Sequence, residues 1–428
     1  MNSCAQTAEA VASPERLIHP APHIFEHRGN IFAFDPDAVR LMALDEKEAR
    51  NEILSTRCTA KALPLPDRVE IMVNAAQECN LSCRYCFVDR GRFGYREDRV
   101  RNLSAHHARR LVEVLHRAFP LIGEICIHFY GGEPLLNLPA IQAAVDAAAS
   151  IRDPRFVFAI TTNGTVCSSE AISVLRKGRF NVILSIDGPA HIHDAVRGTT
   201  SGAPTHGRVL EFLNILRTGP RMFVRGSSVV RKGWSLREAR AYLGTLPVDA
   251  IKAQAVRLPQ DHDLALSEKE RKQYFEDLKQ TADEVIESVE RGKNPGDDRF
   301  NHRVLQLICG TRRTAFCGAG RWIFGLAADG TVLPCALLAG NKEASLGNID
   351  EPDWKWVKRG RIWAEEHGPR SECRSCWALP LCGGGCPAML SVCGEDECDM
   401  VRANCEMALA IYGSFLNRPS DLLVLAGI

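Results

Sequence analysis

The chain has 428 residues, of which 45% are hydrophobic and 25% charged, and its formal net charge is +1. This length allows roughly two to four domains with ordinary globular cores. The balanced charge gives no reason to expect nucleic acid or a membrane surface as a partner, and no apolar run approaches the roughly 18 to 20 residues of a spanning helix. Residues 1–14 lack the basic start and apolar stretch of a secretory signal, so we expect a cytoplasmic protein.

The cysteines are too many and too clustered for a protein with structural thiols alone. There are 17 of them, and in a reducing compartment they are better explained as metal ligands than as disulfides. Three lie close together in Cys79-Asn-Leu-Ser-Cys83-Arg-Tyr-Cys86, and most of the others lie between Cys309 and Cys405. The sequence therefore predicts at least two metal-binding regions.

The first 66 residues predict a small domain of their own. Short apolar segments indicate strands at His23–His27, 30–34 and 38–44, and a helix is expected at Glu46–Ser55. This order resembles the peptide-recognition element at the front of many ribosomal-peptide maturases, which would bind the leader of a peptide substrate. A small cap that packs on the next domain explains the pattern equally well.

Residues 67–298 alternate between strand and helix patterns. Strands are expected at 69–75, 124–130, 156–162, 181–187, 222–230 and 249–257, and helices at 104–119, 138–150, 169–177, 206–216, 235–246 and 267–291. Six consecutive β/α units predict a parallel α/β sheet, open or closed as a partial (β/α)6 TIM-like barrel. Ligands of such a barrel bind at the carboxyl ends of the strands.

The cysteine triplet follows the first of these strands. A four-iron, four-sulfur cluster normally takes four protein ligands, so three thiols leave one iron open to another ligand. A zinc site completed by His106 or His107 is the alternative. With Tyr85 before the third cysteine, the triplet resembles the C-x3-C-x-aromatic-C signature of radical S-adenosylmethionine (radical SAM) enzymes, in which the amino and carboxylate groups of the cofactor occupy the open iron.

The following strand ends supply further matches to that family. A Gly-Gly-Glu-Pro turn after the second strand matches the motif that holds the methionine amino group, and Arg197 resembles the arginine that pairs with the cofactor carboxylate. Polar residues end the third and fourth strands, where the family makes ribose and carboxylate contacts. The resemblance implies that the cofactor contacts are Tyr85, Gly131, Gly132, Glu133, Pro134, Asn163, Ser185, Asp187 and Arg197. The sequence does not identify a catalytic base.

Residues 299–428 carry the second cysteine field, C-x12-G-x4-C followed by C-x2-C-x5-C-x3-C and a last cysteine. These spacings resemble the SPASM domain, which holds two auxiliary four-iron clusters; a zinc ribbon would use only some of the thiols. The resemblance implies a distal cluster on Cys373, Cys376, Cys382 and Cys405, and a cluster nearer the barrel on Cys317, Cys335 and Cys386. Cys309 or a substrate thiol would complete the nearer cluster, and Cys393 and Cys398 are weaker rivals to Cys405.

The resemblance to SPASM-containing peptide maturases implies the reaction class. S-Adenosylmethionine is cleaved by one electron from a reductant such as flavodoxin or ferredoxin, and the 5′-deoxyadenosyl radical then modifies a peptide. The chain looks most similar to thioether-forming maturases of Cys-rich peptides and of quinohemoprotein amine dehydrogenase. Carbon–carbon crosslinking is an alternative, as is formylglycine formation of the anaerobic sulfatase type, although the aspartate expected after Cys335 is replaced by Ala336. An electron-transfer or regulatory iron-sulfur protein is the non-enzymatic alternative.

Overall fold

The computed structural model describes residues 20–44, 60–62, 64, 66–93, 102–389 and 396–427. The helix predicted at Glu46–Ser55 lies outside these residues, as do Cys4, Cys58 and Cys393. No helix of the described residues is long and apolar enough to cross a membrane.

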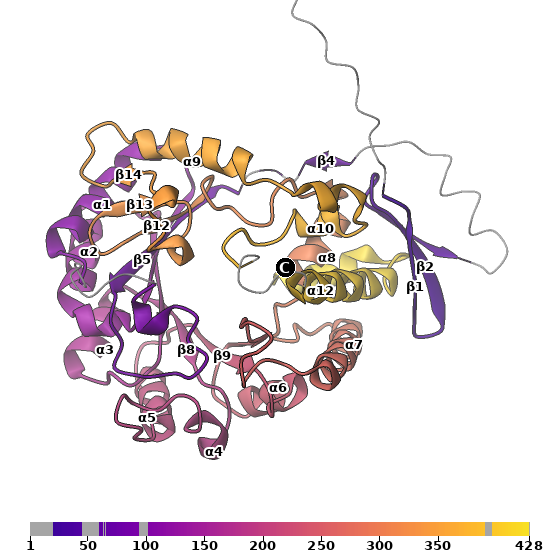
Figure 1. Ribbon diagram of the computed structural model, residues 1–428, viewed down its shortest axis with the longest axis horizontal. Coiled ribbons are helices and arrows are strands. Elements are labelled where there is room, and N and C mark those ends of the chain that lie inside the picture. The colour runs from indigo at the N-terminus through magenta and orange to yellow at the C-terminus, as the bar shows by residue number, and fades with distance from the viewer. Residues whose placement is uncertain are drawn as a thin grey trace, which may run out of the picture.

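The three strands predicted near the N-terminus form a separate antiparallel sheet. They are β1 (His23–His27), β2 (Asn30–Asp35) and β3 (Arg40–Leu44), with β2 in the centre. The sheet lies beside the C-terminal helix α12 at the right of Figure 1. His23 stacks on Trp377 with 3.7 Å between the ring centroids, and its Nε2 lies 2.8 Å from the carboxylate of Glu406. The N-terminal sheet thus contacts the end of the chain, and Arg28 in its first turn also forms an ion pair with Asp283 at 2.6 Å.

The central sheet contains six parallel strands in chain order, which confirms the predicted partial barrel. They are β5 (Arg68–Ala76), β6 (Glu124–Gly131), β7 (Phe156–Thr162), β8 (Asn181–Ser185), β9 (Val224–Val230) and β10 (Ala250–Ala255). The intervening helices are α1 (Ala105–Ala118), α2 (Leu138–Ile151), α3 (Ser169–Lys177), α4 (Ala190–His193), α5 (His206–Arg217), α6 (Leu236–Gly244) and α7 (Glu268–Glu290). Figure 1 shows the strands curving around a centre, with the helices outside.

Alternation along the strands explains why the helices pack on one face and polar groups line the other. In β5, Val69, Ile71 and Val73 are buried beneath the helices, and each such side chain contributes roughly 1.5–3 kcal/mol by leaving water. The side chain between Val69 and Ile71 is Glu70, which lies 3.1 Å from Nδ1 of His128 on β6. The inner face of the barrel is therefore polar.

The sheet continues past residue 298. β12 (Ile323–Leu326) pairs parallel to β5 on the side away from β6, and β13 (Thr331–Leu333) and β14 (Gly347–Asn348) follow antiparallel. This pairing brings Cys335, which follows β13, to the edge of the barrel. The predicted domain ranges, 1–66, 67–298 and 299–428, stay predictions.

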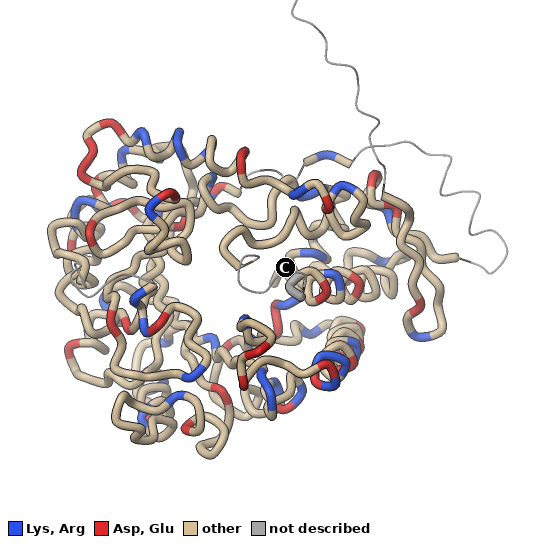
Figure 2. The backbone as a smooth tube through the Cα atoms, in the orientation of Figure 1, with Lys and Arg blue, Asp and Glu red and all other residues tan. Residues whose placement is uncertain are grey.

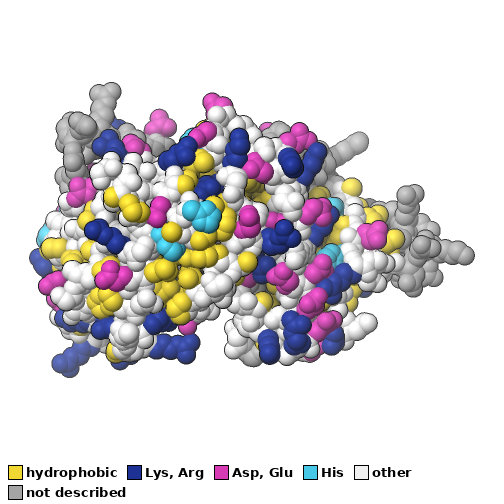
Figure 3. Space-filling view, turned by 90° about the horizontal axis from the view of Figure 1, so that it is seen from below, with side chains coloured by type: hydrophobic (Ala, Val, Ile, Leu, Met, Phe, Trp, Pro, Cys, Tyr) yellow, Lys and Arg dark blue, Asp and Glu magenta, His cyan; other side chains and the backbone are white. Residues whose placement is uncertain are grey.

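The rest of the C-terminal region consists of short helices and loops. Its helices are α8 (Asn301–Ile308), α9 (Lys355–Glu366), α10 (Leu379–Cys382) and α12 (Asp396–Gly413), followed by the 3-10 helix η6 (Pro419–Ala426). A short parallel pair, β4 (Lys61–Ala62) and β11 (Thr311–Arg312), links it to the N-terminal region. Lys and Arg are interspersed with Asp and Glu along the chain in Figure 2 and over the face seen in Figure 3, as the net charge of +1 leads one to expect.

Candidate cofactor and metal sites

The cysteine triplet lies in the loop after β5 and is held against the segment that carries Arg197. The amide of Ser82 donates to the carbonyl of Gly198 at 2.9 Å, and the amide of Arg84 donates to the carbonyl of Val196 at 3.0 Å. The loop that carries the thiols and the segment that carries the predicted carboxylate-binding arginine are therefore one unit.

The three triplet thiols face a common space. Burial, followed by the nearness of Glu133 and of the thiols of Cys83 and Cys86, raises the pKa of Cys79 to about 12. Backbone amides oppose this by donating to sulfur, from Leu81 to Cys79 at 3.4 Å and from Arg90 to Cys86 at 3.2 Å. Amides directed at sulfur stabilise the thiolates that bind iron.

The triplet fits an iron-sulfur cluster better than a single ion. Within the residues that the structure describes, no three His, Cys, Asp or Glu side chains converge closely enough to hold one metal ion. In a four-iron cluster each thiolate binds a different iron, so its ligands stand farther apart than those of a mononuclear site. His106 and His107, the alternative zinc ligands, lie at the start of α1 and pair with Asp350 instead.

Gly131 and Gly132 allow the turn after β6 to pack directly on the cysteine loop. Gly131 has φ +127°, and a Cβ on Gly132 would lie 2.0 Å from the carbonyl oxygen of Glu78. The amides of Gly132 and Glu133 donate to the carbonyls of Ala76 and Glu78, both at 2.9 Å. Pro134 then begins the 3-10 helix η2 (Pro134–Asn137), where a missing N–H costs nothing. The two glycines are required by this backbone contact.

Glu133 is wholly buried and serves the neighbouring strand end. Its carboxylate accepts hydrogen bonds from the amide of Asn163 at 2.7 Å, the hydroxyl of Thr162 at 2.8 Å and the amide of Leu135 at 3.1 Å. Burial raises the pKa of Glu133 to about 7 although these hydrogen bonds act to lower it. Its side chain therefore fixes the end of β7 beside the triplet.

The end of β7 reaches the triplet through Asn163. The Nδ2 atom of Asn163 donates to Oδ1 of Asn80 at 2.9 Å and lies 3.7 Å from the sulfur of Cys79. Ser185 is half-buried at the last position of β8. Asn163 and Ser185 therefore both lie at the carboxyl ends of their strands, the edge of the sheet where the triplet also lies.

Tyr85, Asp187 and Arg197 form a buried polar group beside Cys83. The hydroxyl of Tyr85 donates to the carboxylate of Asp187 and accepts from Nη1 of Arg197 at 2.7 Å, and Arg197 lies 4.0 Å from Asp187. The amide of Val229 also donates to Asp187 at 3.1 Å. The residue types were predicted from the motifs, but this contact was not, because Tyr85 and Asp187 are far apart in sequence.

Arg197 has one hydrogen-bond donor that no described residue satisfies. Its Nε is buried and has no hydrogen-bond partner among the described residues, while its charge acts on the thiol of Cys83. Buried guanidinium donors are normally paired. An orphaned donor beside the triplet fits a ligand carboxylate, as S-adenosylmethionine would provide.

His193 supports the backbone of Arg197 through Thr205, and no motif in the sequence pointed to it. It is fully buried at the end of α4. Its Nδ1 accepts from the amide of Asp187 at 3.3 Å, which leaves Nε2–H to donate to Thr205 at 3.1 Å; Thr205 in turn donates to the carbonyl of Arg197 at 2.7 Å. Burial, reinforced by the charge of Arg197, lowers the pKa of His193 to about 3.

A second group of thiols combines Cys317, Cys335 and Cys386. Burial, and then the thiols of Cys317 and Cys386, raise the pKa of Cys335 to about 12, while the amide of Leu337 acts to lower it. The three residues predicted for the nearer auxiliary cluster are therefore brought together. Cys309 is exposed at the end of α8.

A third group lies between α10 and α12. Burial, and then the thiol of Cys405, raise the pKa of Cys382 to about 11, and the thiol of Cys376 acts on Cys405. Cys398 is also within reach, since the thiols of Cys373 and Cys376 help to raise its pKa beside a larger effect of burial. The structure thus brings together the four predicted distal ligands with Cys398, which the spacing ranked lower.

The glycines before Cys386 direct backbone amides at sulfur. Gly383, Gly384 and Gly385 have φ values of +78°, +106° and +84°, which only glycine adopts readily. The amides of Gly384 and Gly385 hydrogen-bond to the thiol of Cys382 and lower its pKa. Such a concave row of amides favours anionic sulfur.

Tyr130 lies between the first and second thiol groups. Burial, and then the thiols of Cys86 and Cys335, raise its pKa above the ordinary range. Tyr130 is on the inner face of β6, and Cys335 reaches it because β12 pairs with β5. The triplet and the second thiol group therefore face the same interior.

Comparison with known proteins agrees with this geometry. Residues 38–219 match the model of the radical SAM superfamily. A cysteine-type anaerobic sulfatase-maturating enzyme from Clostridium perfringens is 25% identical over 342 residues, which cover 73% of this chain and 86% of the relative.

Two solved structures share the fold. Native anSMEcpe with bound AdoMet superimposes with a TM-score of 0.68 at 18% identity, covering 82% of this chain and 99% of that one. Streptococcus suis SuiB bound to precursor peptide SuiA gives a TM-score of 0.55 at 17% identity, covering 76% and 73%.

Proposed function

We propose that this chain, an enzyme with a radical SAM domain over residues 38–219, modifies a peptide or protein by joining a cysteine sulfur to a carbon atom. A radical SAM enzyme uses a four-iron cluster and S-adenosylmethionine, and when bound these supply a 5′-deoxyadenosyl radical that removes a hydrogen atom from the substrate. The residues of the chain bind and orient the reactants and exclude water.

The residues around the triplet fit the cofactor in named roles. Cys79, Cys83 and Cys86 would hold the cluster, and the orphaned Nε of Arg197 would take the methionine carboxylate. Asp187 is occupied by Tyr85 and Val229, so its role is to position Tyr85 and Arg197. The carbonyls and glycines of the Gly131–Pro134 turn would approach the amino group.

The observation that carries the peptide-modifying proposal is the second thiol group. Cys317, Cys335 and Cys386 lie near one another at the inner edge of the barrel, and Tyr130 lies near both Cys335 and Cys86. Closing a thioether removes two hydrogen atoms from the substrate. The radical takes one from carbon, and the thiol loses the other as a proton and an electron. A cluster held by these three thiols would accept that electron, and its missing fourth ligand would be a substrate thiolate.

The third thiol group supports a second auxiliary cluster. Its cysteines are buried or half-buried and receive backbone amides. We expect this cluster to carry electrons between the surface and the nearer cluster, and a flavodoxin or ferredoxin to be the outside reductant.

The relatives support a peptide substrate. The anSMEcpe structure has also been solved with a Kp18Cys peptide, and SuiB with its precursor peptide. We infer that the N-terminal sheet, whose outer strands β1 and β3 have free edges within the described residues, recognises a leader segment by adding a strand.

Formylglycine formation is less well supported than thioether formation. The position after Cys335 is Ala336, a buried side chain without a proton acceptor, where the sulfatase type has an aspartate.

The experiment incubates anaerobically reconstituted enzyme with dithionite, S-adenosylmethionine and cysteine-containing candidate peptides, and follows each peptide by mass spectrometry. We expect a product lighter by two hydrogen atoms that has lost one alkylatable thiol. A product of the same mass that keeps all its thiols indicates carbon–carbon crosslinking, and an aldehyde that reacts with hydrazine indicates formylglycine. Absence of 5′-deoxyadenosine indicates an electron-transfer protein.

A further inference from the structure

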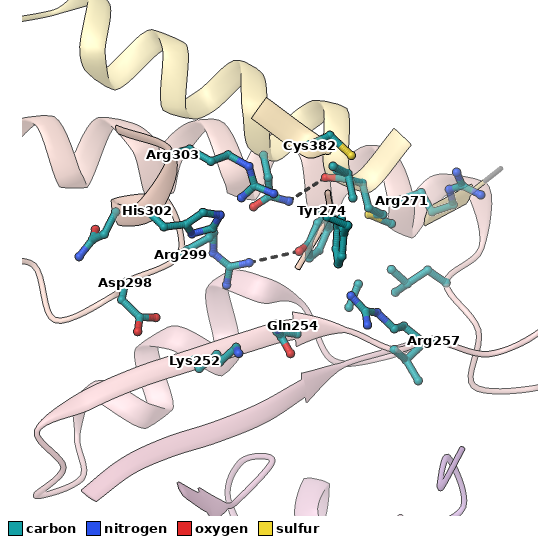
Figure 4. Close-up of a pocket in the computed structure, with 18 of the residues that line it drawn as sticks. Lys252, Gln254, Arg257, Arg271, Tyr274, Asp298, Arg299, His302, Arg303 and Cys382 are labelled. Atoms are coloured by element: carbon teal, nitrogen blue, oxygen red, sulfur yellow. Dashed lines mark hydrogen bonds between the residues drawn. The ribbon is translucent and has the colours of Figure 1, made fainter. Parts of the chain in front are cut away.

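A cavity of about 650 Å³ lies beside the candidate radical site. Its walls come from β10 and the loop after it, from α8, and from the cysteine-rich region (Figure 4). Val256 and Leu258 line this cavity and also pack on the apolar cluster that contains Tyr85, against which Cys83 packs as well. A molecule bound in the cavity would therefore lie next to the cofactor site.

The lining of the cavity is strongly basic. Among the described residues that line it, one acidic side chain, Asp298, faces six cationic ones: Lys252, Arg257, Arg271, Arg299, Arg303 and Arg313. Asp298 is already engaged, because Arg225 donates to it at 2.5 Å. In Figure 4, Lys252 and Arg257 lie on the β10 side and Arg299 and Arg303 lie opposite. The whole chain has a net charge of only +1, so this excess is local.

Two of these cations have donors that the described part of the chain does not satisfy. No hydrogen bond from the ammonium group of Lys252 is present there, and the charged groups nearest to it besides Asp298 are the guanidinium groups of Arg225, Arg257 and Arg299. Arg303 is 9% exposed; its guanidinium group hydrogen-bonds to the thiol of Cys405, while its Nε has no partner among the described residues. Holding a cation among other cations without a hydrogen-bond acceptor is costly, and a ligand carboxylate beside Lys252 would relieve this cost.

The lining also includes several apolar side chains, and these help to decide the class of ligand. Leu266, Phe316 and Met400 line the cavity with Val256 and Leu258. Nucleic acid would instead need an extended positive surface for its phosphates, whereas charges of both signs are interspersed over the face in Figure 3. Cations set among apolar side chains in a recessed cavity suit an acidic residue flanked by apolar ones.

We propose that this cavity binds a peptide segment with an aspartate or glutamate, whose carboxylate contacts Lys252, and that this contact positions the substrate beside the radical site. The inference rests on the proposed function in taking the ligand to be part of the peptide substrate. It adds a requirement for an acidic residue near the modified one.

The experiment measures binding of two short rhodamine-labelled peptides to reconstituted enzyme with S-adenosylmethionine, by fluorescence anisotropy. The peptides contain Ser, Gly and Phe and differ only at a central pair, which is Glu-Glu in one and Gln-Gln in the other. We expect wild type to bind the Glu peptide about tenfold more tightly, since one charge-assisted hydrogen bond has that effect, and Lys252→Gln to remove most of this preference. Lys293→Gln removes a charge from the exposed loop after α7 and should keep the preference.

A substitution that conserves the charge separates an electrostatic effect from a folding defect. Lys252→Arg keeps the positive charge and should keep most of the preference for the Glu peptide that Lys252→Gln loses. Equal binding of the Glu and Gln peptides by wild type overturns the proposal. It is also overturned if a labelled single-stranded oligonucleotide binds more tightly than the Glu peptide and is weakened by Lys252→Gln.

The binding assay is independent of turnover. Peptide modification by an enzyme that shows no preference for Glu removes this inference alone. A clear preference for Glu in an enzyme that modifies no peptide removes the proposed function alone.

Discussion

Replacing Gly132 with alanine tests whether the Gly-Gly-Glu-Pro turn is required by its contact with the cysteine loop. The added Cβ would lie 2.0 Å from the carbonyl oxygen of Glu78, 2.5 Å from its carbonyl carbon and 2.7 Å from the carbonyl oxygen of Arg90. All three atoms are backbone, so the conflict cannot be relieved by rotating a side chain. Overpacking of this kind costs about 1–3 kcal/mol, and loss of the Glu133-to-Glu78 hydrogen bond costs about 1 kcal/mol more.

We therefore expect Gly132→Ala to lower the free energy of unfolding by about 2–4 kcal/mol in anaerobic urea titrations, and to reduce iron bound by the triplet. The matched control is Gly207→Ala in α5, where the described residues place nothing within 4 Å of the added Cβ. That variant should keep the wild-type stability or gain up to roughly 0.5 kcal/mol, because alanine is the better helix former and Gly207 lies in the first turn of α5. Wild-type stability and full iron loading in Gly132→Ala would refute the reasoning.

Three further predictions concern the supports of the site. Arg197→Lys should weaken S-adenosylmethionine binding by about tenfold or more, because lysine cannot replace the planar guanidinium donors; unchanged affinity in equilibrium dialysis contradicts the assignment. His193 has its pKa lowered to about 3, so the unfolded chain binds a proton below its ordinary value of about 6.5 while the folded chain does not, and at pH 5 this removes about 2 kcal/mol of the free energy of unfolding. A His193→Gln variant should show a shallower fall between pH 7 and pH 5 in urea titrations, and an equal slope contradicts the burial argument. Reconstituted wild type should bind about twelve irons, with Cys405→Ala losing about four; if Cys398→Ala loses them instead, Cys398 is the ligand.

The sequence was sufficient for the barrel and for the meeting of its motifs. Apolar periodicity marks strands and helices, and the ends of neighbouring parallel strands must lie together. The turn at Gly132, the end of β7 at Asn163 and the triplet were therefore expected at one edge, where the structure places them.

Side-chain partners could not be predicted in the same way. Nothing in the local sequence indicates that the oxygens of Glu133 bind the end of β7, or that Tyr85 bridges Asp187 and Arg197, because these contacts join separate strand ends. The pairing of β12 with β5 was not predicted for the same reason, because an apolar run does not indicate which strand it pairs with.

The cysteines of α12 show how helix geometry revises a reading based on spacing. Cys398 and Cys405 are seven residues apart in α12, which is about two turns and places both on one face. The ranking by family spacing placed Cys398 below Cys405, although the helix presents both thiols on one face. The cations of the basic cavity were missed because Lys252 and Arg303 look like ordinary surface charges until the fold buries them.

The most direct test of the account is anaerobic formation of 5′-deoxyadenosine from S-adenosylmethionine and dithionite, followed by chromatography. Wild type should release the nucleoside, and Cys83→Ala should release none while keeping the iron bound by the two C-terminal thiol groups. Nucleoside release that persists in Cys83→Ala, or its absence from fully loaded wild type, would contradict the assignment of the triplet as the radical-generating site.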